Sequence, residues 1–555
     1  MKKKASVVLT AFVFAELAVA GGAAEFRVVR NEAGLARLSF TCSSPRVTRF
    51  DVDVNGVWSG SVAVPPRRGT NSCEIVFDAV MRKGVNVVCA RNGEPVLPEI
   101  CAFRAWTVCP SRDLETDRWQ AAIDAAANAG GGRVAIPAGR HLVGCLELRS
   151  NVELHLEKGA VLEGAVGLEN YRIWSLPCSE GTWSAIVAGI GVTNVAITGC
   201  GEIFGNGGAW PLPGRSSGNQ EGLRARGIFF ADSKHVRLED FLLRDTACWG
   251  CVFKCVDGLV ARRVRIDNHS NYNNDGFDIE ASNALFESCD VDASDDAFVF
   301  KSNNAGFVVE NVLVTNCVAR SHCNAYKFGT ASHGTMRKVK FIDCEACPPR
   351  RDFTVKTEKS LHGAAKGEPF WSRRRGYDFY PNGSGIASLV VECVDGGAVE
   401  DILFENIRVS GAMVPLFIRG GTRSGRHNAV PPGTSYFIRN VTMRNIRGEA
   451  ADWTASSISG VEGCRVSDIT LENIDIVCRG AGKERSLDAM SRPVPDVSHA
   501  YPEATMFRHI LPAYGLYVDR VDGLKANNVS FRLRTGDVDS RPPVFFAPPM
   551  AGCAL

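Results

Sequence analysis

Val236-Arg237-Leu238-Glu239-Asp240-Phe241 is a short run of alternating apolar and polar residues that returns along the chain. Alternation over four or five residues predicts a β-strand with one buried face. The residue that closes the phrase falls at positions 241, 264, 289, 317 and 344, in steps of 23 to 28 residues. A nearly constant period in strand-like residues is typical of a solenoid. Because the repeat has few helix-period stretches, we expect an all-β fold, a right-handed parallel β-helix.

The phrase also returns later in the chain, at residues 402–407, 441–446, 469–474 and 524–529. The intervals 344–407 and 474–529 are longer than one coil, so we expect inserted loops around residues 347–385 and 478–510. Such loops would shape the ends of a binding cleft. If a polymer binds there, closed cleft ends would favour cleavage at the ends of that polymer. Their length alone does not decide this.

Candidate catalytic residues follow the same period. Asp275 precedes Asp295 by 20 residues, and Asp296 precedes His322 by 26 residues. Coils of this length would stack these residues about 4.8 Å apart. Stacked carboxylates can share one substrate, which suits acid/base cleavage of a sugar bond. Without the repeat, Asp295 and Asp296 would be ordinary solvated turn residues, and Asp278, within the next strand, suits a structural role.

The N-terminal part has a different pattern. Over residues 25–104, short strands alternate with turn residues, and Asn55-Gly56 and Asn92-Gly93 are hairpin signals. We expect a small β-sandwich over 25–104, with a structural or carbohydrate-adjacent role. The β-helix would then occupy residues 105–555.

A helix is expected over residues 113–129, ahead of Gly130-Gly131-Gly132. Its apolar residues fall on one helical face: Trp119, Ala122, Ile123 and Ala126. This helix would cap the open end of the first coil and protect its strand edges.

Residues 1–24 resemble a secretory signal peptide. Lys2-Lys3-Lys4 is followed by a mostly apolar stretch to Ala20 and by small residues up to Ala24. A membrane anchor is the alternative, but the stretch is short for a span, and no later segment is long and apolar enough. We therefore expect export to the periplasm or the medium, with no membrane span once the signal is removed.

The chain has 20 cysteines, which in an exported protein suggest disulfides. Three of them, Cys289, Cys317 and Cys344, occupy the closing slot of the repeat, where free Cys packs as a small apolar residue. We expect a buried ladder of free thiols there and no zinc site. The better disulfide candidates lie outside the repeat: Cys42, Cys73, Cys89, Cys101 and Cys109.

The charge balance is nearly neutral, with a formal net charge of +2. This gives no support to nucleic acid as a partner. We expect no cofactor, no metal and a monomeric protein.

With these motifs in hand, the chain resembles glycoside hydrolase family 28, the polygalacturonases and rhamnogalacturonan hydrolases. Asn273-Asn274-Asp275-Gly276 is similar to the family's Asn-Thr-Asp-Gly motif, Ser294-Asp295-Asp296 to Gly-Asp-Asp, and Ser321-His322-Cys323 to Gly-His-Gly. Ile136-Pro137-Ala138-Gly139 resembles its opening. Each motif is weak alone, but their order and one-coil spacing are specific, and the resemblance covers about residues 106–545.

The resemblance implies inverting hydrolysis of a pectic oligo- or polysaccharide. It assigns the general acid to Asp295 and the activation of water to Asp275 and Asp296, with His322 orienting the acid or a sugar hydroxyl. Crowded carboxylates cannot all ionise, so one of them should retain a proton.

One departure from the family concerns the substrate. Where the family has Arg-Ile-Lys, this chain has Val390-Val391-Glu392. Glu392 would repel a uronate, so plain polygalacturonase activity is in doubt, while Lys327 would compensate. The residues expected to contact substrate are Asn273, Lys301, Lys327, Glu392, Arg419 and Trp249, the last by stacking on a sugar ring or, equally, by packing under a loop.

Two other functions remain open. A polysaccharide lyase on the same fold would need a calcium cluster and a basic proton abstractor, and it would form an unsaturated product. A non-catalytic carbohydrate-binding β-helix would bind sugar, and the substitution Asp295→Asn would cause no change in product.

Overall fold

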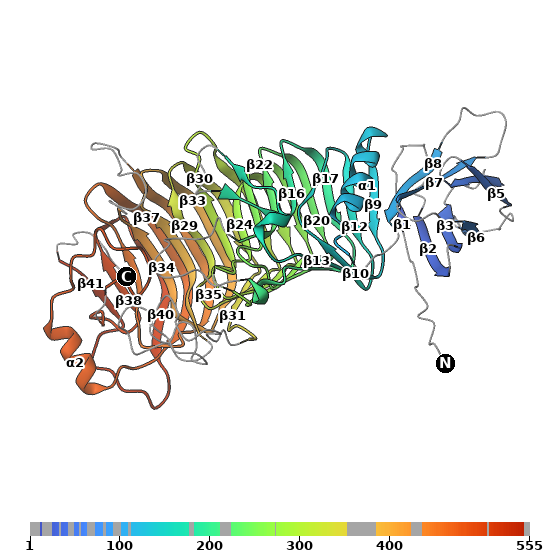
Figure 1. Ribbon diagram of the computed structural model, residues 1–555. Coiled ribbons are helices and arrows are strands. Elements are labelled where there is room, and N and C mark those ends of the chain that lie inside the picture. Colours follow the sequence, from blue (N-terminus) through green and yellow to red (C-terminus); the bar gives the residue numbers. More distant parts are fainter. Residues whose placement is uncertain are drawn as a thin grey trace.

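The computed structural model describes residues 113–176, 182–210, 224–271, 273–351, 384–422, 436–507 and 510–548, together with the backbone of eight short strands before residue 109. From β9 onward the strands pair almost entirely in parallel and wind into one long β-helix (Figure 1). The predicted fold class is confirmed.

Three strand ladders run along the β-helix. The first carries the candidate site, and we call it the site sheet: β11 (Leu146–Glu147), β16 (Ala185–Ile190), β19 (Arg226–Ala231), β22 (Cys251–Arg262), β24 (Phe277–Glu287), β26 (Phe298–Ser302), β29 (Asn324–Ser332), β32 (Gly385–Cys393), β34 (Ala412–Gly420), β36 (Ser456–Ser459), β38 (Leu516–Asp519) and β41 (Val544–Phe546).

The second ladder contains the repeated phrase: β9 (Gly132–Ile136), β12 (Val152–Leu156), β17 (Thr193–Thr198), β20 (Lys234–Glu239), the later halves of β22 and β24, β27 (Val309–Thr315), β30 (Thr335–Ile342), β33 (Ala398–Val409), β35 (Tyr436–Glu449), β37 (Cys464–Cys478), β39 (Val521–Asp522) and β40 (Lys525–Leu533).

The third ladder contains β10 (Gly139–Val143), β13 (Ala160–Gly164), β18 (Glu202–Phe204), β21 (Leu242–Arg244), β23 (Arg265–Asn268), β25 (Asp290–Ala293), β28 (Val318–Ser321) and β31 (Glu345–Cys347), and it continues through the later halves of β33, β35, β37 and β40.

The polar residue just before each closing apolar residue makes the corner between the second and third ladders. It has a positive φ in every coil of the repeat, at residues 240, 263, 288, 316, 343, 406, 445, 473 and 528. Asn and Asp tolerate this left-handed conformation better than most residues, which explains their frequency there. From Asn406 to Asn528 the amide side chains also form an exposed hydrogen-bonded ladder, with steps of 2.8 to 2.9 Å.

The closing residues themselves point into the core. Cys289, Cys317 and Cys344 are buried and free, as predicted. The Cys289 amide donates a hydrogen bond to Cys317 Sγ at 3.4 Å. On the inner face of the site sheet, aromatic rings stack from coil to coil, with Phe298 centred 5.3 Å from Phe277 and 5.4 Å from Tyr326. This stack of buried rings supports the site strands from the inner face of the sheet.

Helix α1 (Thr116–Asn128) covers the first coil of the β-helix (Figure 1). Its buried residues are the four predicted ones, Trp119, Ala122, Ile123 and Ala126. The Trp119 indole nitrogen donates a hydrogen bond to buried Glu115, which also contacts His141 at 2.8 Å. The helix closes the hydrophobic core at that end.

The strands before residue 109 form two mainly antiparallel groups. One contains β1 (Phe12–Val13), β2 (Glu25–Glu32), β3 (Leu35–Cys42) and β6 (Cys73–Val80), and the other contains β4 (Arg49–Val54), β5 (Val57–Ala63), β7 (Val85–Asn92) and β8 (Cys101–Val108). Strand β8 also pairs in parallel with β9. The division into domains at residue 104 stays a prediction.

Other sequence-based expectations fall mostly outside the described residues. The predicted signal peptide lies outside the described residues except for β1. The side chains of the five N-terminal disulfide candidates also lie outside them. In the part of the chain searched, no helix has the length and apolar character needed to cross a membrane.

The cysteine ladder predicts a pattern of thiol reactivity. Burial raises the pKa of Cys344 to about 12, which suppresses its thiolate. In the native protein at neutral pH, we expect Cys289, Cys317 and Cys344 to resist a maleimide, while exposed Cys200 reacts as an internal control. Mass spectrometry of the labelled peptides measures this. Rapid native labelling of the three ladder thiols would contradict their burial.

Candidate active site

The four predicted catalytic residues lie at the starts of three adjacent strands of the site sheet. Asp275 precedes β24, Asp295 and Asp296 precede β26, and His322 precedes β29. Phe277, Phe298 and Tyr326 are register partners in these strands, so the preceding turns stack on one another. The structure therefore brings the predicted catalytic set together.

Backbone hydrogen bonds tie the three turns to each other. The Gly276 amide donates to the Asp296 carbonyl at 2.8 Å, and the Asp295 amide donates to the Asn274 carbonyl at 3.3 Å. The buried Asn274 amide group donates to the carbonyls of Thr246 and Cys248, at 2.7 and 3.1 Å. These bonds fix the turns before any substrate arrives, which is the preorganisation that acid/base chemistry requires.

Asp296 is buried between two donors. Lys327 Nζ lies 3.0 Å from its Oδ2, and Asn324 Nδ2 donates to its Oδ1 at 2.7 Å. Burial alone would raise the pKa of Asp296, but Lys327 and Asn324 outweigh it, and the net pKa is below the usual range. Burial would likewise lower the pKa of Lys327, whereas Asp296 and Glu392 raise it well above its usual value. Both partners are therefore held charged.

Asp275 has the opposite environment. It is 3% exposed, and its Oδ1 has no hydrogen-bond partner among the described residues. Burial, followed by the charges of Asp278 and Asp295, raises the pKa of Asp275 well above its usual range. Within the acid cluster, Asp275 therefore holds a proton more readily than Asp296 does. Asp295 is the most exposed of the three.

Asp278 and Lys301 form a second buried pair, on the outer side of β24 and β26. Lys301 Nζ lies 2.5 Å from Asp278 Oδ1 and 3.9 Å above the centre of the Trp249 ring. Burial raises the pKa of Asp278, and the Lys301 charge opposes this. Trp249 is 4% exposed, and a lysine covers its ring face. Trp249 thus packs against the site, and its ring is not presented as an open sugar platform.

The remaining predicted contacts are spread over several coils. Glu392 lies on β32, with its carboxylate 3.9 Å from Lys327 Nζ. Arg419, on β34, is a register partner of Glu392 but donates to Ser459 Oγ and to the Val497 carbonyl, at 3.1 and 3.0 Å. Asn273 accepts a hydrogen bond from Arg224 at 3.0 Å. Glu392 and Lys327 therefore border the acids, whereas Arg419 is held two strands beyond Lys327.

The sequence model of Glycosyl hydrolases family 28 matches residues 128–324 and 387–494, more than half of the chain. The chain belongs to this family. Its sequence is accordingly that of a glycoside hydrolase.

Individual relatives are distant. A polygalacturonase from Juniperus ashei is 22% identical over 292 residues, which are 51% of this chain and 50% of the relative. This chain thus spans about half the length of that protein. An exopolygalacturonase structure from Thermotoga maritima has a TM-score of 0.51 at 20% identity, covering 66% of this chain and 86% of its own. For the Erwinia carotovora polygalacturonase the TM-score is 0.49, at 17% identity, with coverage of 67% and 92%. At 20% identity the Thermotoga maritima structure shows a shared fold and nothing more.

His322 lies in the turn that stacks on the Asp295–Asp296 turn, and its backbone amide donates to the Ala293 carbonyl at 3.1 Å. The His322 Nε2 is 2.7 Å from the Arg351 carbonyl, so this nitrogen must carry the proton and donate. The ring meets His269 edge to face, with centroids 5.5 Å apart. These contacts fix the orientation of His322, which fits the positioning role implied by the family resemblance.

Asp295, Asp296 and Cys323 bring three potential ligand atoms within 4.8 Å of one another. The set does not suit calcium, which binds six to eight oxygen ligands and not a buried thiol. The acid cluster thus gives no structural support to the calcium-dependent lyase alternative.

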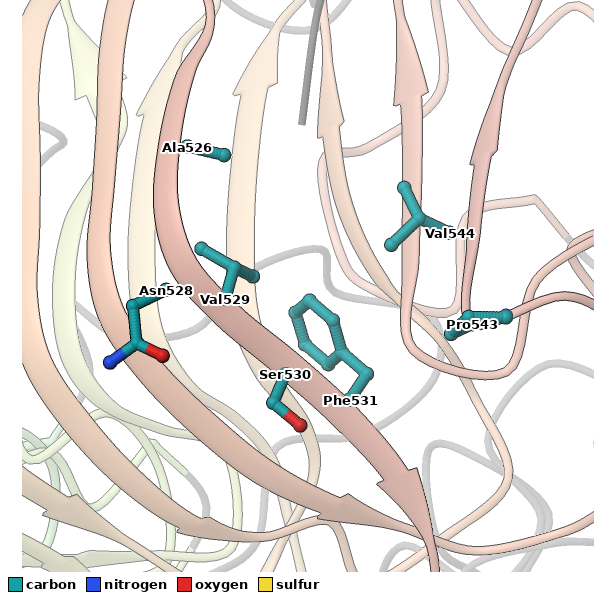
Figure 2. Close-up of a pocket in the computed structure, with 7 residues that line it drawn as sticks. All are labelled: Ala526, Asn528, Val529, Ser530, Phe531, Pro543 and Val544. Atoms are coloured by element: carbon teal, nitrogen blue, oxygen red, sulfur yellow. The ribbon is translucent and has the colours of Figure 1, made fainter.

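A separate hollow lies at the far end of the solenoid. Its volume is about 620 Å³, and Figure 2 shows that its lining comes from the last coils: Ala526, Asn528, Val529, Ser530, Phe531, Pro543 and Val544. From β26 to β41 the site sheet advances six strand steps, about 29 Å at ~4.8 Å per step. This hollow is therefore remote from the acids.

Two contributors to the site went unnoticed in the sequence. Asn324 donates to Asp296, and Tyr501 places its hydroxyl 3.0 Å from Thr330 Oγ1 on the strand that carries Lys327. The motif order signals neither residue. Asn324 follows the Ser321-His322-Cys323 motif closely enough to have been considered, whereas Tyr501 comes from a distant insert without periodicity.

Replacing Lys327 with Met tests the electrostatic role of the lysine. Without the ammonium, the pKa of Asp296 should rise, because the charge that lowers it is gone. The acidic limb of the pH profile of kcat/KM on the polysaccharide substrate should move to higher pH. We expect a roughly tenfold or larger loss at about pH 4 and a smaller loss near neutrality.

The matched control is Lys340→Met, which changes an exposed lysine on β30. We expect a loss of stability, because two buried carboxylates lose their counter-charge, and thermal melting measures it. A loss of stability alone would lower kcat/KM at every pH and would not move the acidic limb of the pH profile. An unshifted acidic limb in a folded K327M protein would rule out this role.

Proposed function

We propose that this glycoside hydrolase cleaves a pectic polysaccharide by inverting, acid/base-assisted attack of water. The observation that carries the proposal is one stacked acid cluster in which the carboxyls have opposite surroundings. Asp296 is paired with Lys327 at 3.0 Å, which lowers its pKa, whereas buried Asp275 has an oxygen without a hydrogen-bond partner among the described residues, and its pKa is raised. A site that holds a base and a proton side by side at one pH has what this reaction needs.

The roles follow from exposure and charge. Asp296, ionised and backed by Lys327, is suited to accept a proton from the attacking water. Asp295 is the carboxyl most open to a leaving oxygen, and it is suited to deliver the proton that the cluster retains. The three carboxyls interact closely enough to titrate as a unit, so the resting proton on Asp275 belongs to the cluster. His322, fixed by the Arg351 carbonyl, orients the group beside it.

Within pectic substrates, the charges favour rhamnogalacturonan over polygalacturonan. Among the described residues that border the acids, Lys327 is shared by Asp296 and Glu392, and Lys301 is paired with Asp278. Glu392 is 1% exposed, so its charge would repel a uronate in the site through space and not by contact. A neutral rhamnose ring avoids that repulsion.

Export and quaternary state complete the proposal. The basic and apolar pattern of residues 1–24 supports secretion to the periplasm or the medium, where pectic polymers are encountered. We propose that the mature protein acts as a monomer, because the four predicted catalytic residues come from one chain.

The acids are tested by amide substitution, which preserves shape and removes the ionisable group. Asp295→Asn and Asp296→Asn should each lower the rate of sugar release from rhamnogalacturonan by roughly 10²- to 10⁴-fold. Binding of the same polysaccharide, measured by affinity electrophoresis, should persist. The control is Asp232→Asn at an exposed corner of positive φ that Asn also accepts. Full activity in either acid variant would refute the hydrolase mechanism proposed for this cluster.

Substrate preference is tested by removing the charge of Glu392. The parent enzyme should release more sugar from rhamnogalacturonan than from polygalacturonan under matched conditions. Glu392→Gln should raise the polygalacturonan rate relative to the rhamnogalacturonan rate, about tenfold for a gain of about 1.4 kcal/mol. The ratio of initial rates by reducing-end assay measures this. Strong parent activity on polygalacturonan, with no change in the ratio for E392Q, would contradict the charge argument.

A further inference from the structure

The outer face of the site sheet is covered immediately beyond the acids. In the coils that follow, several positions in line with the catalytic turns and several outward strand positions are apolar and buried, whereas Glu392 and Arg419 on the same face are charged. The apolar residues form one cluster with residues of the insert between β37 and β38: Cys323, Ile386, Ala387, Val390, Met413, Val414, Phe417, Ala455, Met506, Phe507, Leu511, Ala513 and Tyr517. We call the described residues 494–507 and 510–513 the capping segment.

Polar contacts tie the capping segment to the sheet. Arg419 donates to the Val497 carbonyl at 3.0 Å, and the Thr422 amide donates to the Ser498 carbonyl at 3.1 Å. Arg541 donates to the Leu511 carbonyl at 3.1 Å. From Pro502 onward most of the segment's described side chains are buried, so this part of it is packed onto the sheet in the structure.

The capping segment reaches the edge of the site through Tyr501. Its hydroxyl lies 3.0 Å from Thr330 Oγ1 on β29, three residues along the strand from Lys327. The charges of Lys327 and Glu392 both act on this phenol, whose pKa burial raises. Tyr501 therefore forms a wall beside the Lys327–Glu392 pair. A ring at this position would obstruct a sugar chain that ran along the solenoid axis towards β32.

A second wall stands on the other side of the acids. Trp183, from the hairpin of β14 (Trp174–Ser175) and β15 (Thr182–Trp183), stacks on outward-facing Phe229 of β19 with centroids 5.0 Å apart. Trp183 also contacts Trp249 at 5.5 Å, and Arg226 lies 4.2 Å from its ring centre. Both tryptophans are buried. This cluster occupies the face that a polymer would otherwise follow towards the N-terminal coils.

The open stretch between the walls is short. From β22, at the Trp249 side, to β29, at the Tyr501 side, the site sheet advances three strand steps, about 14 Å at ~4.8 Å per step. We propose that the site is a pocket closed at both ends along the axis, so that the enzyme removes short units from the end of a sugar chain. This inference rests on the proposed hydrolytic function and adds its mode of action.

Product analysis tests the pocket directly. Rhamnogalacturonan and polygalacturonan oligosaccharides, fluorescently labelled at the reducing end, are incubated with enzyme and sized at early times by capillary electrophoresis. We expect stepwise shortening from one end, with no early mid-chain fragments. Early fragments of all intermediate lengths from the parent enzyme would overturn the proposal. If neither substrate is cut, the proposed function fails, and that outcome is distinct from mid-chain cutting.

Variants then assign the wall. Tyr501→Ala removes the ring and should raise the fraction of mid-chain cuts at least several-fold, while Tyr501→Phe keeps the ring and should retain the parent pattern. Arg492→Ala, at an exposed position just before the capping segment, is the control. Thermal melting confirms folding. A folded Y501A enzyme with the parent product pattern would overturn the assignment of the wall to Tyr501.

Discussion

The parallel register of neighbouring coils is the constraint on which the whole molecule depends. Successive strands lie about 4.8 Å apart, and each residue faces its counterpart in the coil before and after it. Apolar residues in register build the core, as in the stack of Phe277, Phe298 and Tyr326. Acids at the starts of adjacent strands are brought together by the same register, so their mutual repulsion is imposed by the fold.

The site accommodates that repulsion in two ways. The negative charge of Asp296 is balanced by the positive charge of Lys327. Burial beside other carboxyls raises the pKa of Asp275, which favours its protonated form. Burying charges is costly unless each is paired, and the outer side of the sheet shows such pairing at Asp278 with Lys301. The same pairing limits what the site can recognise. A lysine shared by two carboxylates is poorly suited to hold a third from a uronate.

The sequence predicted the parts of this account that depend on periodicity. The closing residues of the repeat gave the coil length, and the left-handed corner explains why Asn or Asp so often precedes them. Motif order located Asp275, Asp295, Asp296 and His322. Side-chain partnerships were harder to anticipate, because Lys327 was expected to meet a uronate and the structure shows it bound to Asp296.

The sequence did not predict which distant residues cover the site. The insert around 478–510 was recognised by its length, but it has no repeat that fixes where it folds. Its contacts, such as Tyr501 with Thr330, join residues 171 positions apart. Packing of apolar side chains against β32 and β34 decides its path, and such packing leaves no local pattern in the chain.

The anomeric configuration of the first product is the most direct test of the central claim, that the stacked acids perform inverting hydrolysis. Oxygens of Asp295 and Asp296 lie within 4.8 Å of one another, closer than the roughly 6.5–9.5 Å usual for inverting pairs. Proton NMR during the first minutes of cleavage should show the anomer opposite to the bond that was cut. A product of retained configuration, or an unsaturated sugar, would contradict the account.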